Sequence, residues 1–140
     1  MHTLTTEQAA QRAKEHVQHA VAALPIQPSL TKKSGLSTEC LDPDDDGPQG
    51  RYEVDRSYWL DDIPKDRNTE IVNTLHQHWK NNNYRILSDK RASDDKFISV
   101  EHNGDGFQMS VLQSDEGDLS LGAASPCVWP DGAPPSSAQQ

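Results

Sequence analysis

Apolar and polar residues follow two different periods along this chain, and each period predicts a different kind of element. Between residues 10 and 24 the apolar positions recur at steps of three and four, which is the spacing of one helix face. Thr5 and Gln8 stand in capping-box position before this stripe, and Pro25 follows it. The pattern therefore predicts an amphipathic helix over residues 4–24.

After residue 51 apolar positions alternate with polar ones, a period of two that is typical of strands. The alternation predicts strands at residues 52–59, 84–88, 97–102, 107–112 and 119–123. Between the first two of these, Ile71, Leu75 and Trp79 share one helical face. Pro64 suits the first turn of that helix, and the asparagine run at 81–83 suits its end.

This order of elements predicts an α+β fold. An N-terminal helix is followed by the order β-α-β-β-β-β, and each strand has one polar side. Because such alternation implies that one side of a sheet faces water, we expect a mostly antiparallel sheet covered by helices on one face only.

The 140 residues suffice for one domain, and the aromatic residues locate its core. All of them lie between Tyr52 and Trp129, and aromatic side chains bury the most area per residue. We therefore assign residues 1–129 to a single domain with its core in 52–129. The stretch 25–51 is rich in Pro, Gly, Ser and Asp and is expected to form an irregular connector with short pairings. Residues 130–140 lack large apolar side chains and are expected to form a disordered tail.

The chain has two cysteines, Cys40 and Cys127, with no CxxC spacing that would indicate a zinc site. They are either two separate buried thiols or a disulfide. Closing so long a loop stabilises a fold by up to ~4.5 kcal/mol in the chain-entropy model, which would help a domain poor in aliphatic residues. We therefore interpret the pair as a structural disulfide, which indicates an oxidising compartment.

The charge balance narrows the classes of partner. There are 13 Lys and Arg residues against 22 Asp and Glu residues, for a net charge of −9. This acidity argues against a nucleic-acid partner, since there is no basic surplus to neutralise phosphates, and it suits a basic protein. No apolar run reaches the length of a transmembrane segment, and no cofactor is expected.

One stretch has the spacing of a calcium-binding loop. Asp42, Asp44, Asp46 and Glu53 match the pattern D-x-[DN]-x-[DN]-G-x5-E at each specified position. The expected flanks are a connector and a strand, whereas a calcium loop of this kind joins two helices. A solvated acidic turn is therefore the favoured interpretation, and calcium binding is a speculative alternative.

No motif predicts catalysis. The chain lacks the G-x-S-x-G elbow of serine hydrolases, and no catalytic residue is assigned. His76 and His78 are two positions apart on a helix and point away from each other, so they cannot share a metal. His16 and His19 could meet on one helix face, but their polar neighbours indicate a solvated surface. We expect a protein that is not an enzyme.

Several short stretches carry a resemblance to other proteins: CLDP at 40–43, GPQGR at 47–51, YWL at 58–60, NYRI at 83–86 and SPCVWP at 125–130. Over about residues 36–130 the chain resembles small secreted or lipid-anchored proteins of actinobacteria of the Streptomyces type, a group generally of unknown function. The resemblance implies an extracellular or cell-envelope location, a signal segment that this chain does not show, and a structural disulfide.

Together these features predict a non-enzymatic cell-envelope or extracellular domain that acts as a binding module. The candidate partner surface is the sheet face, with Tyr58 and Trp59, or the acidic connector. Three alternatives stay open: a calcium-binding module that uses residues 42–53, a small acidic inhibitor or immunity-type protein, and a hydrolase.

Overall fold

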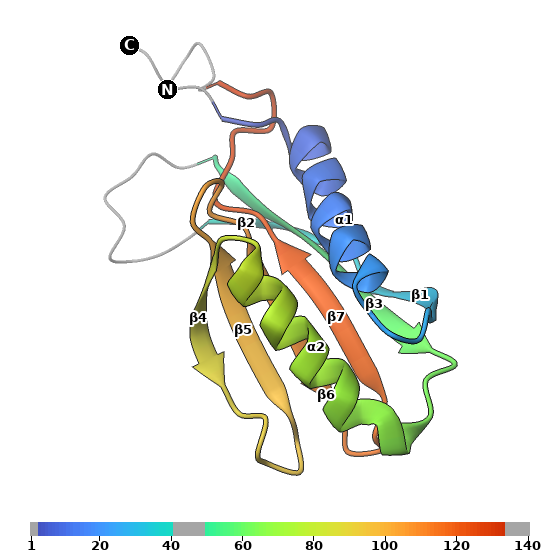
Figure 1. Cartoon of the computed structure of the whole chain (residues 1–140). Coiled ribbons are helices and arrows are strands. Elements are labelled where there is room, and N and C mark those ends of the chain that lie inside the picture. Colours follow the sequence, from blue (N-terminus) through green and yellow to red (C-terminus); the bar gives the residue numbers. More distant parts are fainter. Residues whose placement is uncertain (1–2, 41–49, 134–140) are drawn as a thin grey trace.

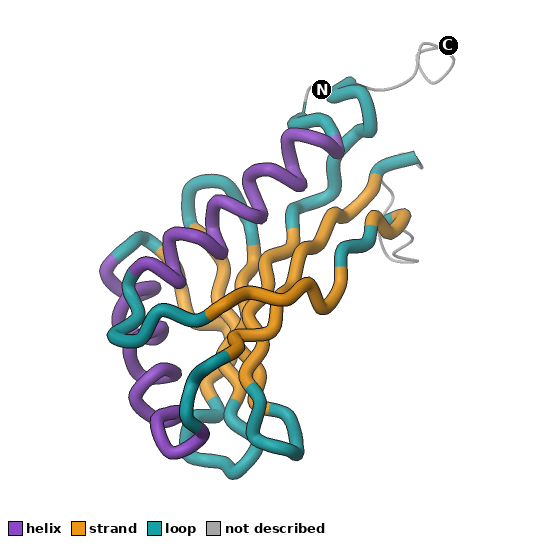
Figure 2. Tube along the Cα trace, turned by 90° about the vertical axis from the view of Figure 1, so that its right-hand side faces the viewer, coloured by secondary structure: helices purple, strands orange, loops and turns teal. Residues whose placement is uncertain are grey.

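The computed structural model describes residues 3–40 and 50–133, which form the predicted α+β architecture (Figure 1). Both helices lie on the same side of one sheet, and this layering is clearest from the side (Figure 2). The elements in chain order are α1 (Thr6–Ala22), β1 (Ser29–Ser34), β2 (Ser37–Glu39), β3 (Tyr52–Asp61), the 3-10 turn η1 (Lys65–Arg67), α2 (Asn68–Asn81), β4 (Tyr84–Asp89), β5 (Phe97–His102), β6 (Gln108–Gln113) and β7 (Leu119–Ala124).

The sheet has seven strands, and the pairings within the described residues are all antiparallel. Its main path runs β1-β3-β7-β6-β5-β4, and β2 pairs with β3 beside this path. The segment containing α2 carries the chain from β3 to the far edge, where β4 begins a meander that returns strand by strand. The last strand, β7, therefore closes the sheet from the inside, between β3 and β6.

Helix α1 begins as its sequence pattern predicts. The Thr5 side chain accepts a hydrogen bond from the backbone N–H of Gln8, and the Gln8 side chain accepts one from the backbone N–H of Thr5. The buried stripe differs from the predicted one at three positions, because Ala9 and His16 are buried whereas Ala10 is only partly so. The buried alanines of this stripe allow the helix to lie close against β3 and β7.

Helix α2 begins later than Pro64, which stands before the 3-10 turn that leads into the helix at Asn68. The Asn68 side chain donates a hydrogen bond to the carbonyl oxygen of Gly117 at 2.8 Å, which ties the helix start to the β6–β7 turn. At the other end Asn83 has φ 70°, the left-handed conformation that asparagine tolerates. The buried face of the helix is Ile71, Val72, Leu75 and Trp79 together with Asn68.

The predicted connector is more regular than its composition indicates. Two strands, β1 and β2, occur within residues 25–51, and both pair with β3. β1 has five exposed residues out of six, so its sequence carries almost no alternation that could have revealed it. Its position is set by hydrogen bonding along the edge of β3, with a bulge between Lys32 and Ser34.

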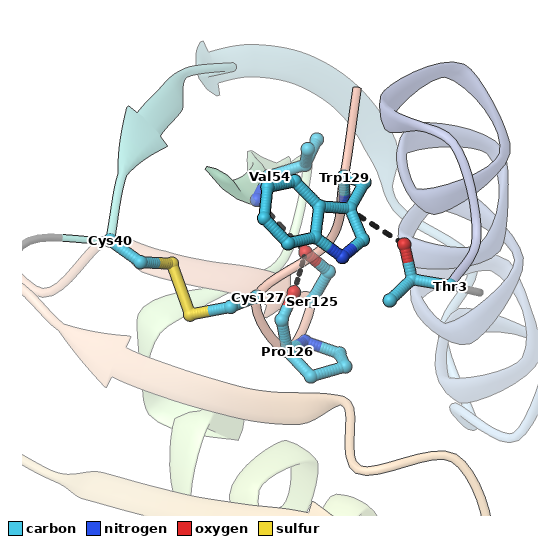
Figure 3. Close-up of a disulfide and its surroundings, with 7 residues drawn as sticks. All are labelled: Thr3, Cys40, Val54, Ser125, Pro126, Cys127 and Trp129. Atoms are coloured by element: carbon cyan, nitrogen blue, oxygen red, sulfur yellow. Dashed lines mark hydrogen bonds between the residues drawn. A yellow bond between two sulfur atoms is a disulfide. The ribbon is translucent and has the colours of Figure 1, made fainter. Parts of the chain in front are cut away.

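The predicted disulfide is confirmed. Cys40 and Cys127 are bonded, with Cα atoms 6.3 Å apart and 87 positions of separation in the sequence. Around it, as Figure 3 shows, the Ser125 hydroxyl accepts a hydrogen bond from the backbone N–H of Val54 at 2.9 Å. The disulfide joins the segment before β3 to the segment that follows β7. A β-bridge between Tyr52 and Val128 connects the same two segments.

The C-terminal segment is ordered further than residue 129, where the predicted tail begins. The backbone N–H of Thr6 donates to the carbonyl oxygen of Pro130 at 3.2 Å, and that of Thr3 donates to Gly132 at 2.8 Å. In addition, the Thr3 hydroxyl accepts a hydrogen bond from the backbone N–H of Trp129 (Figure 3). Residues 130–133 therefore belong to the packed structure, while 134–140 lie outside the described residues.

Candidate functional site

Within the described residues the helices cover one face of the sheet and leave the other uncovered. The alternation of side chains along each strand assigns each residue to one of these faces. On β3, Val54 and Leu60 are buried and Tyr58 packs against the core, so the even-numbered residues face the helices. Trp59 points the other way, because adjacent residues in a strand lie on opposite faces. Of the two residues predicted to form the partner surface, only Trp59 lies on the uncovered face.

A row of small residues crosses this uncovered face at right angles to the strands. The register pairs Ser57 of β3 with Gly122 of β7, Gly122 with Ser110 of β6, and Ser110 with Ser99 of β5. The outer strands extend it, because Ser34 of β1 pairs with Ser57 and Ser88 of β4 pairs with Ser99. We call these residues, Ser34, Ser57, Gly122, Ser110, Ser99 and Ser88, the serine row.

The hydroxyl groups of this row are available to a ligand. All of its members are partly exposed. The Ser34 hydroxyl donates to Asp55 at 3.4 Å, but the other four serine side chains have no hydrogen-bond partner within the described part of the chain. A half-buried hydroxyl without a protein partner is satisfied by water or by a bound molecule.

Gly122 has no side chain, so nothing protrudes from the sheet in the middle of the serine row. A Cβ atom at that position would lie 2.9 Å from the Cβ of Ser57 and 3.4 Å from the carbonyl oxygen of Arg56. The close approach of β3 and β7 leaves no room for a side chain there. A hollow of about 450 Å³ opens over this part of the face, and its lining includes Ser57, Ser99, Ser110 and Gly122.

Two different walls flank the serine row, each about 6.6 Å from it along the strands. On one side the register aligns large apolar side chains across the strands, with Ser120 between the first two; we call Trp59, Leu112 and Phe97 the apolar wall. On the other side it aligns polar and charged side chains, with Ala124 between the first two; we call Asp55, Gln108, Glu101 and Arg85 the polar wall.

Lys33 of β1 lies over the apolar wall. Its ammonium group is 4.9 Å from the centroid of the Trp59 ring and donates a hydrogen bond to the Ser120 hydroxyl at 3.2 Å. Such a cation–π contact at a partly exposed site is worth about 0.5–1 kcal/mol. Lys33 is therefore held by weak contacts that an incoming ligand can replace.

A second polar cluster lies on the covered side, between α1 and the β5–β6 loop. The buried ring of His16 is hydrogen-bonded at Nδ1 to the Tyr84 hydroxyl and at Nε2 to the Asp105 carboxylate, 2.8 Å away. Since a carboxylate can only accept, Nε2 carries the proton and Nδ1 accepts from Tyr84. His16 also stacks on Phe107, with ring centroids 5.1 Å apart.

The pKa values in this cluster follow from its burial. Burial lowers the pKa of His16 below 6.5, against the opposing effect of Asp105. Burial also raises the pKa of Asp105, but the hydrogen bonds from Phe107 and His16 outweigh this effect and leave the pKa below 3.8. Burial raises the pKa of Tyr84 to about 12, so at neutral pH the phenol is protonated and donates to His16. The three groups connect α1 to β4 and to the β5–β6 loop.

A hollow of about 400 Å³ adjoins this cluster, lined by His19, His78, His102 and Arg12 among others. The prediction that His16 and His19 share a solvated face is wrong for His16, which is only 7% exposed. The sequence did contain a signal for the burial of His16, because this residue lies three positions after Ala13 and four before Ala20 in the apolar stripe. The polar neighbours at 15 and 18 concealed it.

The cluster meets one requirement of the hydrolase alternative, a cleft with a histidine of shifted pKa, but its hydroxyl group does not suit a nucleophile. It contains a cleft and a histidine whose pKa is shifted, as that alternative requires. The hydroxyl that meets this histidine, however, belongs to Tyr84, whose raised pKa makes it a poor nucleophile. The hydrogen bonds of His16 with Tyr84 and Asp105 link helix α1 to the sheet and to the β5–β6 loop.

The predicted calcium ligands Asp42, Asp44 and Asp46 lie outside the described residues, and Glu53 is exposed on β3. Residues 3–40 and 50–133 contain no group of three or more His, Cys, Asp or Glu side chains placed to hold a metal ion. His76 and His78 do diverge: His76 lies 3.4 Å from Asp89 of β4, whereas His78 faces the hollow beside α1. Within the same residues, no helix combines the length and the apolar character needed to cross a membrane.

Comparison of the chain with protein-family models, with curated proteins and with solved structures finds no match in any of the three.

Proposed function

We propose that the chain is a non-enzymatic, extracytoplasmic binding domain that holds its ligand on the uncovered face of the sheet, along the serine row. The observation that carries the proposal is the row itself. Four serine hydroxyls of the row have no hydrogen-bond partner among the described residues, and three of them, those of Ser57, Ser99 and Ser110, line a hollow of about 450 Å³. An array of this kind offers hydrogen bonds to a ligand at little cost, because its side chains are short and already ordered.

The disulfide supports the location. Disulfides persist in oxidising compartments and are rare in the cytosol. The Cys40–Cys127 bond is therefore compatible with an extracellular or cell-envelope protein. The resemblance to secreted and lipid-anchored actinobacterial proteins supports the same location.

The test maps where ligands bind. The oxidised chain, labelled with 15N, is titrated separately with solubilised bacterial cell-wall fragments, with lysozyme as a basic protein, and with phosphatidylglycerol vesicles. We expect at least one of these probes to shift the amide resonances of the serine row and of its walls. Shifts confined to the helices, or none with any of the three probes, would overturn the proposal.

A matched pair of variants makes the test sharper. Ser110→Trp fills the middle of the serine row, whereas Gln77→Trp places the same side chain on the exposed surface of α2, on the other side of the sheet. Binding should be lost in the first variant and kept in the second. An unchanged thermal midpoint in both variants shows that the fold is intact, and equal binding by both contradicts the proposal.

A further inference from the structure

We infer that the ligand of this face is a linear, uncharged glycan that lies across the strands along the serine row. The inference rests on the function proposed above and names the class of molecule bound. Four properties of the site carry it: the chemistry of the serine row, the apolar wall, the balance of charge, and the direction and length of the row.

The serine row matches the hydrogen-bonding needs of a sugar. Each sugar hydroxyl is both a donor and an acceptor, and so is each serine hydroxyl, which can rotate to suit its partner. Ser57, Ser88, Ser99 and Ser110 have no protein partner within the described residues, so each can supply a hydrogen bond to a ligand. A row of equivalent hydroxyls suits a repeating polymer better than a single compact molecule.

The apolar wall supplies the second feature that sugars use. The C–H faces of a pyranose ring are apolar and pack against flat aromatic surfaces. Trp59 and Phe97 are both partly exposed on this wall, and Leu112 between them is 40% exposed. A glycan in the serine row can therefore place its hydroxyl edges on the serines and its ring faces against Trp59 and Phe97.

The charge at the site is balanced, which favours an uncharged ligand. Lys33 and Arg85 are matched by Asp55 and Glu101. Arg56 also borders the hollow, but as an even-numbered residue of β3 it belongs to the covered face, where it lines the groove beside α1. Arg85 is paired directly with Glu101, and Asp55 accepts a hydrogen bond from the backbone N–H of Leu36 at 3.1 Å. A phosphate or uronate polymer would find no net positive charge here, although the chain as a whole is acidic.

The direction of the row argues against a peptide. An extended peptide binds a sheet by pairing with the backbone of an edge strand. The serine row crosses the inner strands β3, β7, β6 and β5, whose backbone groups pair with their neighbours in the sheet. Along this line the ligand meets serine hydroxyls, with Gly122 of β7 as the one member of the row that has none.

The length of the row predicts a length dependence. From β1 to β4 the row spans six strands, and neighbouring strands lie about 4.8 Å apart, so it is about 24 Å long. A disaccharide covers a fraction of that distance, whereas a hexasaccharide can follow most of it. Each added sugar unit meets another serine, except over Gly122, until the row is filled.

The experiment measures the affinity of the oxidised full chain by calorimetry. The probes are chitohexaose, cellohexaose and maltohexaose, the corresponding disaccharides, and a charged hexamer of galacturonic acid. We expect at least one neutral hexamer to bind about tenfold more tightly than its disaccharide and than the charged hexamer. Tryptophan fluorescence should change on binding, because Trp79 and Trp129 are buried and Trp59 is the partly exposed one of the three.

Single substitutions separate the contributions of the apolar wall and of the serine row to the affinity for the glycan. Trp59→Ala should weaken the binding of the neutral hexamer about tenfold and abolish the fluorescence change, and Ser110→Ala should weaken it a few-fold. Gln77→Ala, on α2, should leave the affinity unchanged. Unaltered affinity in Trp59→Ala would overturn the inference, as would equal loss in all three variants.

The outcomes distinguish the two proposals. If cell-wall fragments, lysozyme or vesicles shift the serine-row amides while no neutral hexamer binds at about 5 mM, the glycan inference fails and the proposed function stands. Equal affinity for disaccharides and hexamers, or preference for the galacturonate hexamer, also overturns the inference. If none of the probes touches this face, both proposals fail.

Discussion

The two faces of the sheet are built by the same strands but differ in almost every property. The covered face presents Ile98, Val100, Val111 and Leu121 to the helices, and all four are nearly inaccessible to water. The uncovered face, at positions one residue away, presents serine, glycine and a few aromatic side chains. The strands therefore separate two roles: one face stabilises the fold, and the other is the face that we propose binds a ligand.

This separation predicts that the faces respond differently to substitution. Removing an apolar side chain from the covered face leaves a cavity, since helices pack directly against it. Removing the hydroxyl of Ser99 or Ser110 from the uncovered face costs little, because neither has a hydrogen-bond partner to lose among the described residues. The comparison can be tested on stability, independently of any ligand.

The largest effect is expected on the covered face. Leu121→Ala, in the middle of β7, should lower the free energy of unfolding by about 2–5 kcal/mol, because its side chain is fully buried. Ser110→Ala, on the uncovered face of the adjacent strand β6, should change it by less than about 0.5 kcal/mol. Urea unfolding of the two variants gives both values. A similar loss in both would show that the uncovered face is also packed against something.

A smaller loss of stability is expected from removing the disulfide, which lies at the end of the sheet where β3 begins and β7 ends. The double variant Cys40→Ser/Cys127→Ser should be less stable by about 2–4 kcal/mol, because the unfolded chain loses a constraint on a long loop. The comparison of urea midpoints with the oxidised wild type measures it. Reduction of the wild-type protein should give the same shift, and two free thiols in denatured, unreduced protein would contradict the bond itself.

The smallest effect is a pH dependence of the stability that arises from a group on the covered side of the sheet. Burial lowers the pKa of His16 below 6.5, so the folded protein holds this ring neutral while the unfolded chain still takes up a proton at pH 6.5. The stability from this group is therefore present above pH 6.5 and is lost as the pH falls toward the folded-state pKa. Urea midpoints at pH 7.5 and pH 5 should differ in this direction.

His16→Gln provides the control for that prediction. Glutamine does not titrate, so the fall in stability between the two pH values should be smaller in this variant. A residual slope should remain, because burial also lowers the pKa values of His76 and His78. An identical slope in both proteins would remove His16 from the explanation.

Local patterns predicted the elements on the covered side well. The capping box at Thr5 and Gln8 marks the start of α1, and the apolar positions 71, 75 and 79 mark the buried face of α2. These signals are reliable because helix periodicity and capping depend on residues a few positions apart. The short pairings expected in the connector could not be placed, for the opposite reason: five of the six residues of β1 are exposed, so only its pairing with β3 defines it.

The serine row could not be predicted in the same way. Ser57, Ser99 and Ser110 are ordinary polar positions in three alternating strands, and nothing in their immediate neighbours distinguishes them. They become a row only through the strand order and the register, which place residues far apart in the chain side by side. Tyr58 and Trp59 were predicted to form one surface, but adjacent residues in a strand lie on opposite faces of the sheet.

Residue order along the chain was thus enough to specify the two helices, the strands from β3 onward, and Cys40 and Cys127 as the only possible disulfide partners for each other. The strand order, the bulges in β1 and β4, and the line of hydroxyls across the sheet come from long-range pairing. The physical reason is that periodicity and capping act within a few residues. A surface that crosses six strands depends on backbone hydrogen bonds between segments up to dozens of residues apart.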